Sequence, residues 1–177
     1  LRSVLGLDAK NAAIVLKDAD LHNAVAECVL GALSFNGQRC TALKILFVHK
    51  EIVESFLADF GNAVNILKKG LPWEPGVSIT PLPELNKTGD LAELIDDACG
   101  KGARVVNRGG GSIDHTLMSP AVVYPVEPNM RLYSEEQFGP VVPIAPFSNI
   151  EEPMKYVIQS NYGQQVSLFG SNPKTLA

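Results

Sequence analysis

Short runs of branched apolar residues alternate with amphipathic segments, and this alternation restricts the possible fold more than any other feature of the chain. Residues 12–16 and 45–48 are apolar runs of strand length, as expected for buried parallel strands. Residues 21–35 and 52–67 carry apolar side chains at a three-then-four spacing, which is typical of one buried helical face. The order strand, helix, strand, helix predicts an α/β fold with three layers, in which helices flank a mainly parallel sheet.

The second half of the chain continues this pattern with more interruptions. Further strands are predicted over residues 103–106, 121–124, 141–147 and 166–169, and further helices over residues 90–100 and 150–160. Pro143 and Pro146 donate no ladder hydrogen bond, so we expect their strand at an edge or margin of the sheet. Residues 71–89 contain too many prolines and glycines for a regular element and predict a long surface connection.

Polar residues and glycines mark the ends of the predicted helices. Asp20 and Asp90 stand where a carboxylate can accept from first-turn amides as an N-cap. Asn36 and Gly37 readily adopt the positive φ that ends a helix. The glycine-rich residues 108–112 would cradle a phosphate only if a helix followed directly. No helical period follows, so a surface turn is favoured.

Length and composition favour one sizeable core and one domain, residues 1–177, with 46% hydrophobic residues. Because the chain starts at Leu1 and ends at Ala177 within the start of a predicted helix, we expect it to be a fragment of a longer protein. Its net charge of −4 offers no basic surface for nucleic acid or anionic lipid. The apolar runs are too short to span a bilayer, so neither nucleic acid nor membrane is an expected partner.

The 3 cysteines are widely spaced. This pattern does not suit a disulfide framework and predicts a reducing, cytoplasmic compartment. Neither cysteine nor histidine is paired at ligand spacing, so no metal site is predicted. Cys28, within an apolar helical stripe, and Cys99, near the end of a helix, are interpreted as structural.

Cys40 is the candidate for chemistry. It follows the turn at the end of a well-packed helix, within F-N-G-Q-R-C-T at residues 35–41. The adjacent Arg39 guanidinium would favour the thiolate, the nucleophilic form, over the thiol. The alternative from spacing alone is that Cys40 is a small buried hydrophobe, as most free cysteines are.

A second polar segment, E-E-Q-F-G-P-V at residues 135–141, sets paired carboxylates beside an aromatic ring. Such a pair is also common on an ordinary solvated face. These two segments, followed by N-Y-G at residues 161–163, resemble motifs of the aldehyde dehydrogenase superfamily, in order and over essentially the whole chain. Three shorter stretches are most similar to its non-phosphorylating, NADP-dependent glyceraldehyde-3-phosphate dehydrogenases: G-Q-R-C-T-A-L-K at 37–44, I-T-P-L at 79–82 and N-M-R-L at 129–132.

The resemblance implies oxidation of an aldehyde, glyceraldehyde 3-phosphate in that branch, with NADP or alternatively NAD as cofactor. Cys40 is implied as the nucleophile that forms a thioacyl intermediate. Glu136 is implied to bind the nicotinamide ribose, and Phe138 to position the nicotinamide ring. Arg39 is implied to bind the substrate phosphate, which suits its planar fork of donors. The intact enzyme is implied to be a homo-oligomer.

One position departs from the family pattern. The family's E-L-G-G-K corresponds to Gly6-Leu7-Asp8-Ala9-Lys10, so the general base for thioester hydrolysis is replaced by Gly6, which cannot move a proton. Asp8, another carboxylate or a bound water could take over, the acyl group could leave to a different acceptor, or deacylation could be slow. Most of the nucleotide-binding domain would also lie outside this chain, so the isolated fragment is expected to be inactive.

Two other functions are compatible with parts of the sequence. A cysteine hydrolase or acyl transferase would need His49 within hydrogen-bond reach of the Cys40 sulfur. A catalytically impaired relative, retained as an assembly or regulatory module, would explain Gly6.

Overall fold

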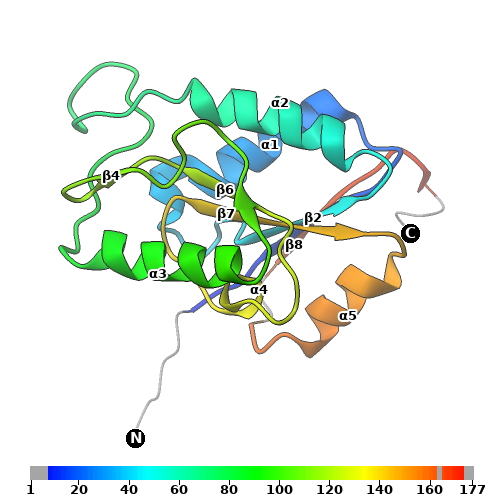
Figure 1. Cartoon of the computed structure of the whole chain (residues 1–177). Helices are drawn as coiled ribbons and strands as arrows, with labels where there is room; N and C mark the ends of the chain where they lie inside the picture. Colours follow the sequence, from blue (N-terminus) through cyan, green and yellow to red (C-terminus); the bar gives the residue numbers. More distant parts are fainter. Residues whose placement is uncertain (1–7, 163–164, 174–177) are drawn as a thin grey trace, which may run out of the picture.

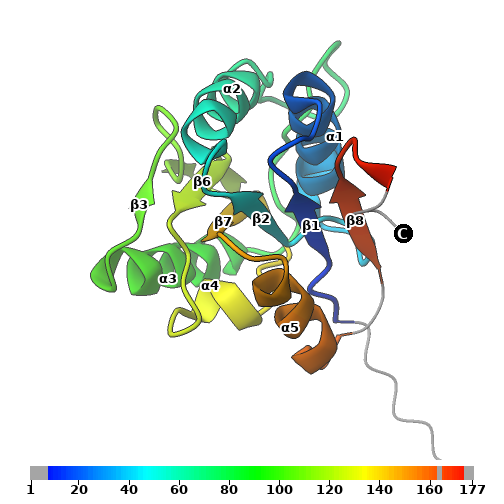
Figure 2. The same ribbon diagram turned by 90° about the vertical axis from the view of Figure 1, so that its right-hand side faces the viewer.

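The computed structural model describes residues 8–162 and 165–173 and contains the predicted α/β fold. Six strands form one sheet in the order β3-β6-β7-β2-β1-β8 (Figures 1 and 2). All neighbouring pairs are parallel except β3 with β6. The strands are β1 (Ala12–Val15), β2 (Ile45–His49), β3 (Arg104–Val105), β6 (Ala121–Tyr124), β7 (Val141–Phe147) and β8 (Val166–Phe169).

Helices cover both faces of the sheet. In Figure 2, α1 and α2 lie above the sheet, whereas α3, α4 and α5 lie below it, which gives the three predicted layers. The helices are α1 (Leu21–Leu33), α2 (Val53–Asn65), α3 (Lys87–Gly100), α4 (Arg131–Ser134) and α5 (Glu151–Gln159). No helix in the described part of the chain is long and apolar enough to cross a membrane.

Alternating strand residues separate the core into two sides. Ala13 and Val15 of β1 pack in the cluster that contains α1 and α2. Ala12 and Ile14 face the opposite side, in the cluster that includes Tyr156 of α5. A third cluster joins α3 and α4 to β6 and β7. Because both faces of the central strands β1, β2, β6 and β7 are largely buried, the register of these strands is fixed.

The predicted ends of the first helix are confirmed, and the predicted start of α3 is wrong. The Asp20 carboxylate accepts from the Asn23 amide at 3.1 Å as an N-cap of α1. Helix α3, in contrast, starts at Lys87 rather than after Asp90. The Asp90 amide already donates to the Asn86 carbonyl at 3.1 Å, so Asp90 lies inside the first turn. Its charge there complements the positive helix end without capping it.

The edge position predicted for residues 141–147 is also wrong, because β7 lies inside the sheet between β6 and β2. The register explains how its prolines are accommodated. Strand β7 pairs with β6 only as far as Pro143, and its pairing with β2, which includes Pro146, starts at Ile144. Each proline therefore lies where one neighbour is unpaired, and no ladder bond to that neighbour is lost.

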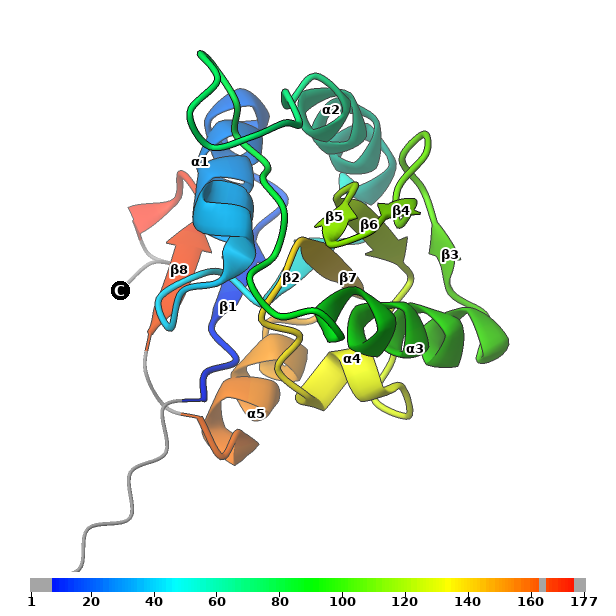
Figure 3. The ribbon, with the colours of Figure 1, turned by 90° about the vertical axis from the view of Figure 1, so that its left-hand side faces the viewer.

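The connections hold a hairpin and the short helix α4, neither of which the sequence pattern predicted. Strands β4 (Ile113–Asp114) and β5 (Leu117–Met118) form a small antiparallel hairpin after the glycine-rich turn. The long connection between α2 and α3 passes alongside α1 on its way to α3 (Figure 3), which brings it to the turn at the end of α1.

Candidate active site

The turn before Cys40 has the backbone conformation that its sequence predicts. After α1, a short 3-10 segment (Ser34–Gly37) ends in three consecutive residues with positive φ, namely Phe35 at 53°, Asn36 at 58° and Gly37 at 71°. The chain thereby leaves the helix abruptly and delivers Cys40 to the surface, where it is exposed. The alternative that Cys40 is a buried hydrophobe is wrong.

Asn36 attaches this turn to the long connection. Its side chain donates to the Thr80 hydroxyl at 3.0 Å and accepts from the Thr80 amide at 2.9 Å. Asn36 is 6% exposed, so the paired bonds are shielded from water and hold the positive-φ turn in one conformation. The Thr80 segment is thus part of the architecture that presents Cys40.

Gly37 brings the turn into direct contact with the segment that carries Glu136 and Phe138. A Cβ atom at Gly37 would lie 2.7 Å from the Gly139 carbonyl oxygen and 2.7 Å from the Ala32 carbonyl oxygen. Only a residue without a side chain permits this approach. The two predicted motifs, about a hundred residues apart in the sequence, therefore touch backbone to backbone.

The carbonyl groups around Cys40 are fixed from two other strands. The side-chain amide of Asn11, just before β1, donates to the carbonyl oxygens of Cys40 at 2.6 Å and Ala42 at 2.9 Å. The side-chain amide of Gln165, just before β8, donates to the Thr41 carbonyl at 2.9 Å. These bonds fix the backbone of the exposed thiol, as a nucleophile requires.

Glu136 and Phe138 lie together at a concavity of about 470 Å³, whose lining also includes Lys87 and Tyr162. Phe138 has a φ of 37°, a conformation that is rare and costly for a residue with a side chain. Oε1 of Glu136 is buried and accepts no hydrogen bond within the described structure. Glu135 is instead occupied by a two-pronged ion pair with Arg131.

The structure adds Lys44 to this site. Its Nζ lies 3.3 Å from Oε1 of Glu136 and 4.6 Å from the centre of the Phe138 ring, and it donates to the Gly37 carbonyl at 2.8 Å. The contact with Glu136 is an ion pair without hydrogen-bond geometry, since Oε1 has no donor. Burial lowers the pKa of Lys44, and the opposing charges of Glu136 and Cys40 raise it.

A second buried lysine, Lys10, stabilises the segment that carries Glu136 and Phe138. Lys10 Nζ donates to Oε1 of Gln137 at 2.6 Å, and Gln137 Nε2 donates to the carbonyl oxygens of Lys44 at 2.9 Å and Val141 at 2.8 Å. Burial lowers the pKa of Lys10 well below its ordinary value, and the Lys44 charge lowers it further. Gln137 thereby connects β1, β2 and β7 at their amino ends.

Arg39 points to a different part of the surface. Its guanidinium lies 5.7 Å from the Phe35 ring centre and within 3.5 Å of the Gly31 carbonyl. There it lines a groove of about 410 Å³ with Glu27 and Gln165. Its Nε is buried and has no hydrogen-bond acceptor within the described structure, so a ligand of this groove would meet the remaining, half-buried part of the guanidinium.

The predicted site lies at the amino ends of parallel strands. Cys40 precedes β2, Glu136 precedes β7, and Asp8, exposed beside the Glu136 concavity, precedes β1. His49 is at the carboxyl end of β2, roughly 13 Å from the amino end of the strand, which Cys40 precedes, at about 3.3 Å per strand residue. A Cys40–His49 pair, which a cysteine hydrolase would need, is therefore excluded.

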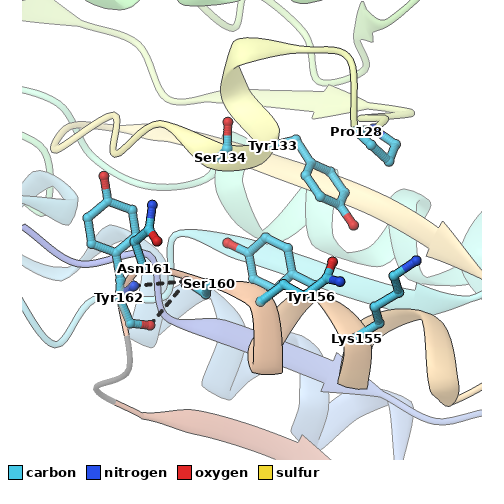
Figure 4. A pocket seen from close by; sticks show the side chains of 9 residues that line it. Pro128, Tyr133, Ser134, Lys155, Tyr156, Ser160, Asn161 and Tyr162 are labelled. Carbon is cyan, nitrogen blue, oxygen red and sulfur yellow. Dashed lines mark hydrogen bonds between the residues drawn. The ribbon is translucent and has the colours of Figure 1, made fainter.

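A further pocket of about 340 Å³ opens between α4 and α5 (Figure 4). Tyr133 and Tyr156 meet edge to face there, with ring centres 5.1 Å apart, and the Tyr156 hydroxyl donates to the Lys10 carbonyl at 3.3 Å. Tyr162 lines both this pocket and the Glu136 concavity. The described residues contain no cluster of three side chains that would hold a metal ion.

The remaining cysteines differ from each other. Cys28 is fully buried in α1, and burial raises the pKa of its thiol to about 12, with a smaller contribution from Glu27. Its interpretation as structural is confirmed. Cys99 is exposed at the end of α3, so burial does not support its interpretation as structural.

The sequence model of the aldehyde dehydrogenase family matches residues 1–177. The chain belongs to this family. It is 38% identical over 172 residues to an NADP-dependent glyceraldehyde-3-phosphate dehydrogenase of Streptococcus equinus, with 96% of this chain and 35% of that protein covered. It is 33% identical over 175 residues to a succinate-semialdehyde dehydrogenase [NADP(+)] of Mycobacterium bovis, with 98% of this chain and 37% of that protein covered.

A solved aldehyde dehydrogenase structure has the same fold. The NADP-dependent glyceraldehyde-3-phosphate dehydrogenase of Bacillus halodurans, complexed with NADP, superposes with a TM-score of 0.90 at 37% identity, and the match covers 95% of this chain and 35% of that one. The chain thus spans about a third of the length of these aldehyde dehydrogenases. Gly6, at the family's base position, and Gly163 of the N-Y-G motif lie outside the described residues.

Proposed function

We propose that this chain is the catalytic domain of an NADP-dependent aldehyde dehydrogenase, with Cys40 as its nucleophile. The observation that carries the proposal is the contact between the Cys40 turn and the Glu136–Phe138 segment through Gly37, Gly139 and Lys44. The turn that carries the exposed thiol is thereby in contact with the segment that carries a partly buried carboxylate and a constrained aromatic ring.

The chemistry at Cys40 is an addition followed by loss of hydride. The thiolate forms a bond to the aldehyde carbon, and the carbonyl π electrons move to the oxygen. The backbone amide of Cys40 would donate to this oxyanion. Departure of hydride from the carbon re-forms the carbonyl and leaves a thioester on Cys40.

The residues of the concavity fit a nicotinamide cofactor. Glu136 lines the concavity with a side chain that is 11% exposed, and a carboxylate there could accept a hydrogen bond from a ribose hydroxyl. Phe138 offers a ring fixed beside it. When bound, NADP, or NAD in its place, would accept the hydride. The nucleotide half of the cofactor would be held by residues outside this chain.

An anionic aldehyde, with glyceraldehyde 3-phosphate as the first choice, is the proposed substrate. The Arg39 guanidinium lines a groove that Thr41, the residue after Cys40, also lines, and a planar guanidinium suits a phosphate or carboxylate. Replacing Arg39 with methionine should raise KM for glyceraldehyde 3-phosphate at least tenfold and leave KM for an uncharged aldehyde nearly unchanged. An equal effect on both aldehydes would remove Arg39 from substrate binding.

The acyl acceptor decides how turnover is completed. We propose water, with exposed Asp8 at the concavity as the first candidate base, since Gly6 cannot serve. The test is an assay of the full-length protein with glyceraldehyde 3-phosphate and NADP in buffer, and again with phosphate or coenzyme A. Steady NADPH formation in buffer alone is expected, and it should disappear in Cys40→Ser.

Other outcomes of this assay point to the alternatives. Turnover only with phosphate or coenzyme A would identify an acyl-transferring dehydrogenase. One equivalent of NADPH per Cys40 without turnover would indicate slow deacylation, and none would favour the assembly or regulatory module that Gly6 suggests. We further propose that the enzyme is cytoplasmic, where Cys40 stays reduced, and homo-oligomeric, which sedimentation of the full-length protein tests.

A further inference from the structure

Lys44 lies between the nucleophile turn and the proposed cofactor segment. Its ammonium contacts Gly37, on the turn that presents Cys40, and Glu136 with Phe138 on the other side. The side chain is 1% exposed. A lysine with a long and flexible stem is thus held in one position by three different groups.

The charged groups around Lys44 lie at different distances from its ammonium. Glu136, whose side chain is 11% exposed, is its ion-pair partner at 3.3 Å. Two cations face it at longer range, Lys87 from the first turn of α3 and Lys10 from the residues before β1. Cys40 lies within electrostatic reach of this ammonium, which donates to the Gly37 carbonyl three residues before Cys40 on the same turn. Because Coulomb attraction is mutual, a cation that the thiolate stabilises also stabilises the thiolate.

Arg39, the cation that is adjacent to Cys40 in sequence, is engaged elsewhere. Its guanidinium is directed at the Gly31 carbonyl and the Phe35 ring, in the groove beside α1. Adjacency in the chain therefore does not place this charge over the sulfur. Lys44, four residues later, has the side chain that turns back under the motif.

We propose that Lys44 is a positioning residue whose ammonium favours the thiolate of Cys40, and that Glu136 weakens this effect through its ion pair with Lys44. The inference rests on the proposed function, in which Cys40 is the nucleophile. The inference identifies Lys44 as the cation that acts on Cys40. It also predicts that removing the Lys44 charge and removing the Glu136 charge shift the alkylation midpoint of Cys40 in opposite directions, which a purely structural role for Lys44 would not predict.

The test is the pH dependence of Cys40 alkylation by iodoacetamide, measured by mass spectrometry of the Cys40 peptide in the full-length protein without cofactor. Lys44→Met should raise the midpoint by about one pH unit and slow alkylation below it about tenfold. Glu136→Gln should lower the midpoint. Lys69→Met, which removes a lysine bonded to a serine hydroxyl away from the site, should leave it unchanged. Arg39→Met should shift it less than Lys44→Met.

An unchanged midpoint in folded Lys44→Met, a shift of the same sign in Glu136→Gln, or a larger shift in Arg39→Met would each overturn the inference. If Lys44→Met does not fold, as judged by circular dichroism, Lys44→Gln takes its place, because its amide can still donate to a backbone carbonyl and carries no charge. Alkylation needs neither aldehyde nor NADP. A failed dehydrogenase assay with the expected midpoints would therefore contradict the proposed function and leave the role of Lys44 intact.

Discussion

Replacing Gly37 with alanine tests whether the backbone contact between the two motifs holds the site together. Gly37 has a φ of 71°, and its missing Cβ would meet the Ala32 and Gly139 carbonyl oxygens at 2.7 Å each. Gly109 is a matched control. Its φ is 67°, but nothing lies within 4 Å of its Cβ position. The two substitutions share the backbone cost and differ in the collision.

The magnitudes follow from these two terms. A left-handed conformation costs an alanine about 1 to 2 kcal/mol, and this applies to both glycines. Forcing a methyl group against packed backbone adds about 1 to 3 kcal/mol, and this applies to Gly37 alone. The reduced freedom of the unfolded chain, worth about 0.4 to 1 kcal/mol, is common to both and cancels. Gly37→Ala should therefore be less stable than Gly109→Ala by about 1 to 3 kcal/mol.

The assay is urea denaturation of both variants, followed by circular dichroism. Hydrogen exchange of peptides from β2 and β7 would assign the transition to this part of the protein. Gly37→Ala should also change the alkylation rate of Cys40, because the turn that carries Cys40 must move to relieve the collisions with the Ala32 and Gly139 carbonyl oxygens. Equal unfolding free energies for the two variants would refute the idea that the motifs are in obligatory contact.

Three further predictions use the same preparations. Asn36→Ala removes both bonds to Thr80 and leaves the Thr80 amide unpaired, so the unfolding free energy should fall by about 2 to 3 kcal/mol; a loss below about 0.5 kcal/mol would contradict this. Cys28, whose buried thiol has its pKa raised to about 12, should resist iodoacetamide at pH 8 until urea unfolds the chain, and early labelling would disprove its burial. Backbone hydrogen bonds lower the pKa of Glu152 at the start of α5, so its contribution to stability is present above the ordinary glutamate pKa and is lost as pH falls through the lower folded value. The stability gap between wild type and Glu152→Gln, measured by urea denaturation, should therefore shrink below about pH 4.5, and a constant gap would argue against it.

The layered fold could be predicted because its signals are local. The apolar spacing of α1, the carboxylate at Asp20 and the positive φ at Gly37 are properties of neighbouring residues. The position of β7 could not be predicted, because it depends on where β6 stops pairing and β2 starts. A proline shows that a backbone donor is missing, and only the strand register shows whether a neighbouring strand has an acceptor opposite that position.

The site divides in the same way. Cys40, Glu136 and Phe138 were identified through motifs, and their roles remain predictions that the experiments above address. Lys44 carried no signal, because a lysine before a strand is ordinarily solvated and its burial depends on a segment 92 residues later in the sequence. The orientation of Arg39 was equally inaccessible, since adjacency along the chain does not determine where a side chain points.

The hydrogen bonds of Gln137 have a consequence for how the protein matures. One bond joins Gln137 to Lys10, 127 positions earlier in the chain, and another joins it to Lys44, 93 positions earlier. These bonds therefore close long loops, which form slowly during folding. The helices and the first strand pair can form before these loops close. Labelling of a refolding chain should therefore show Cys28 protected first and Cys40 reaching its final alkylation rate last.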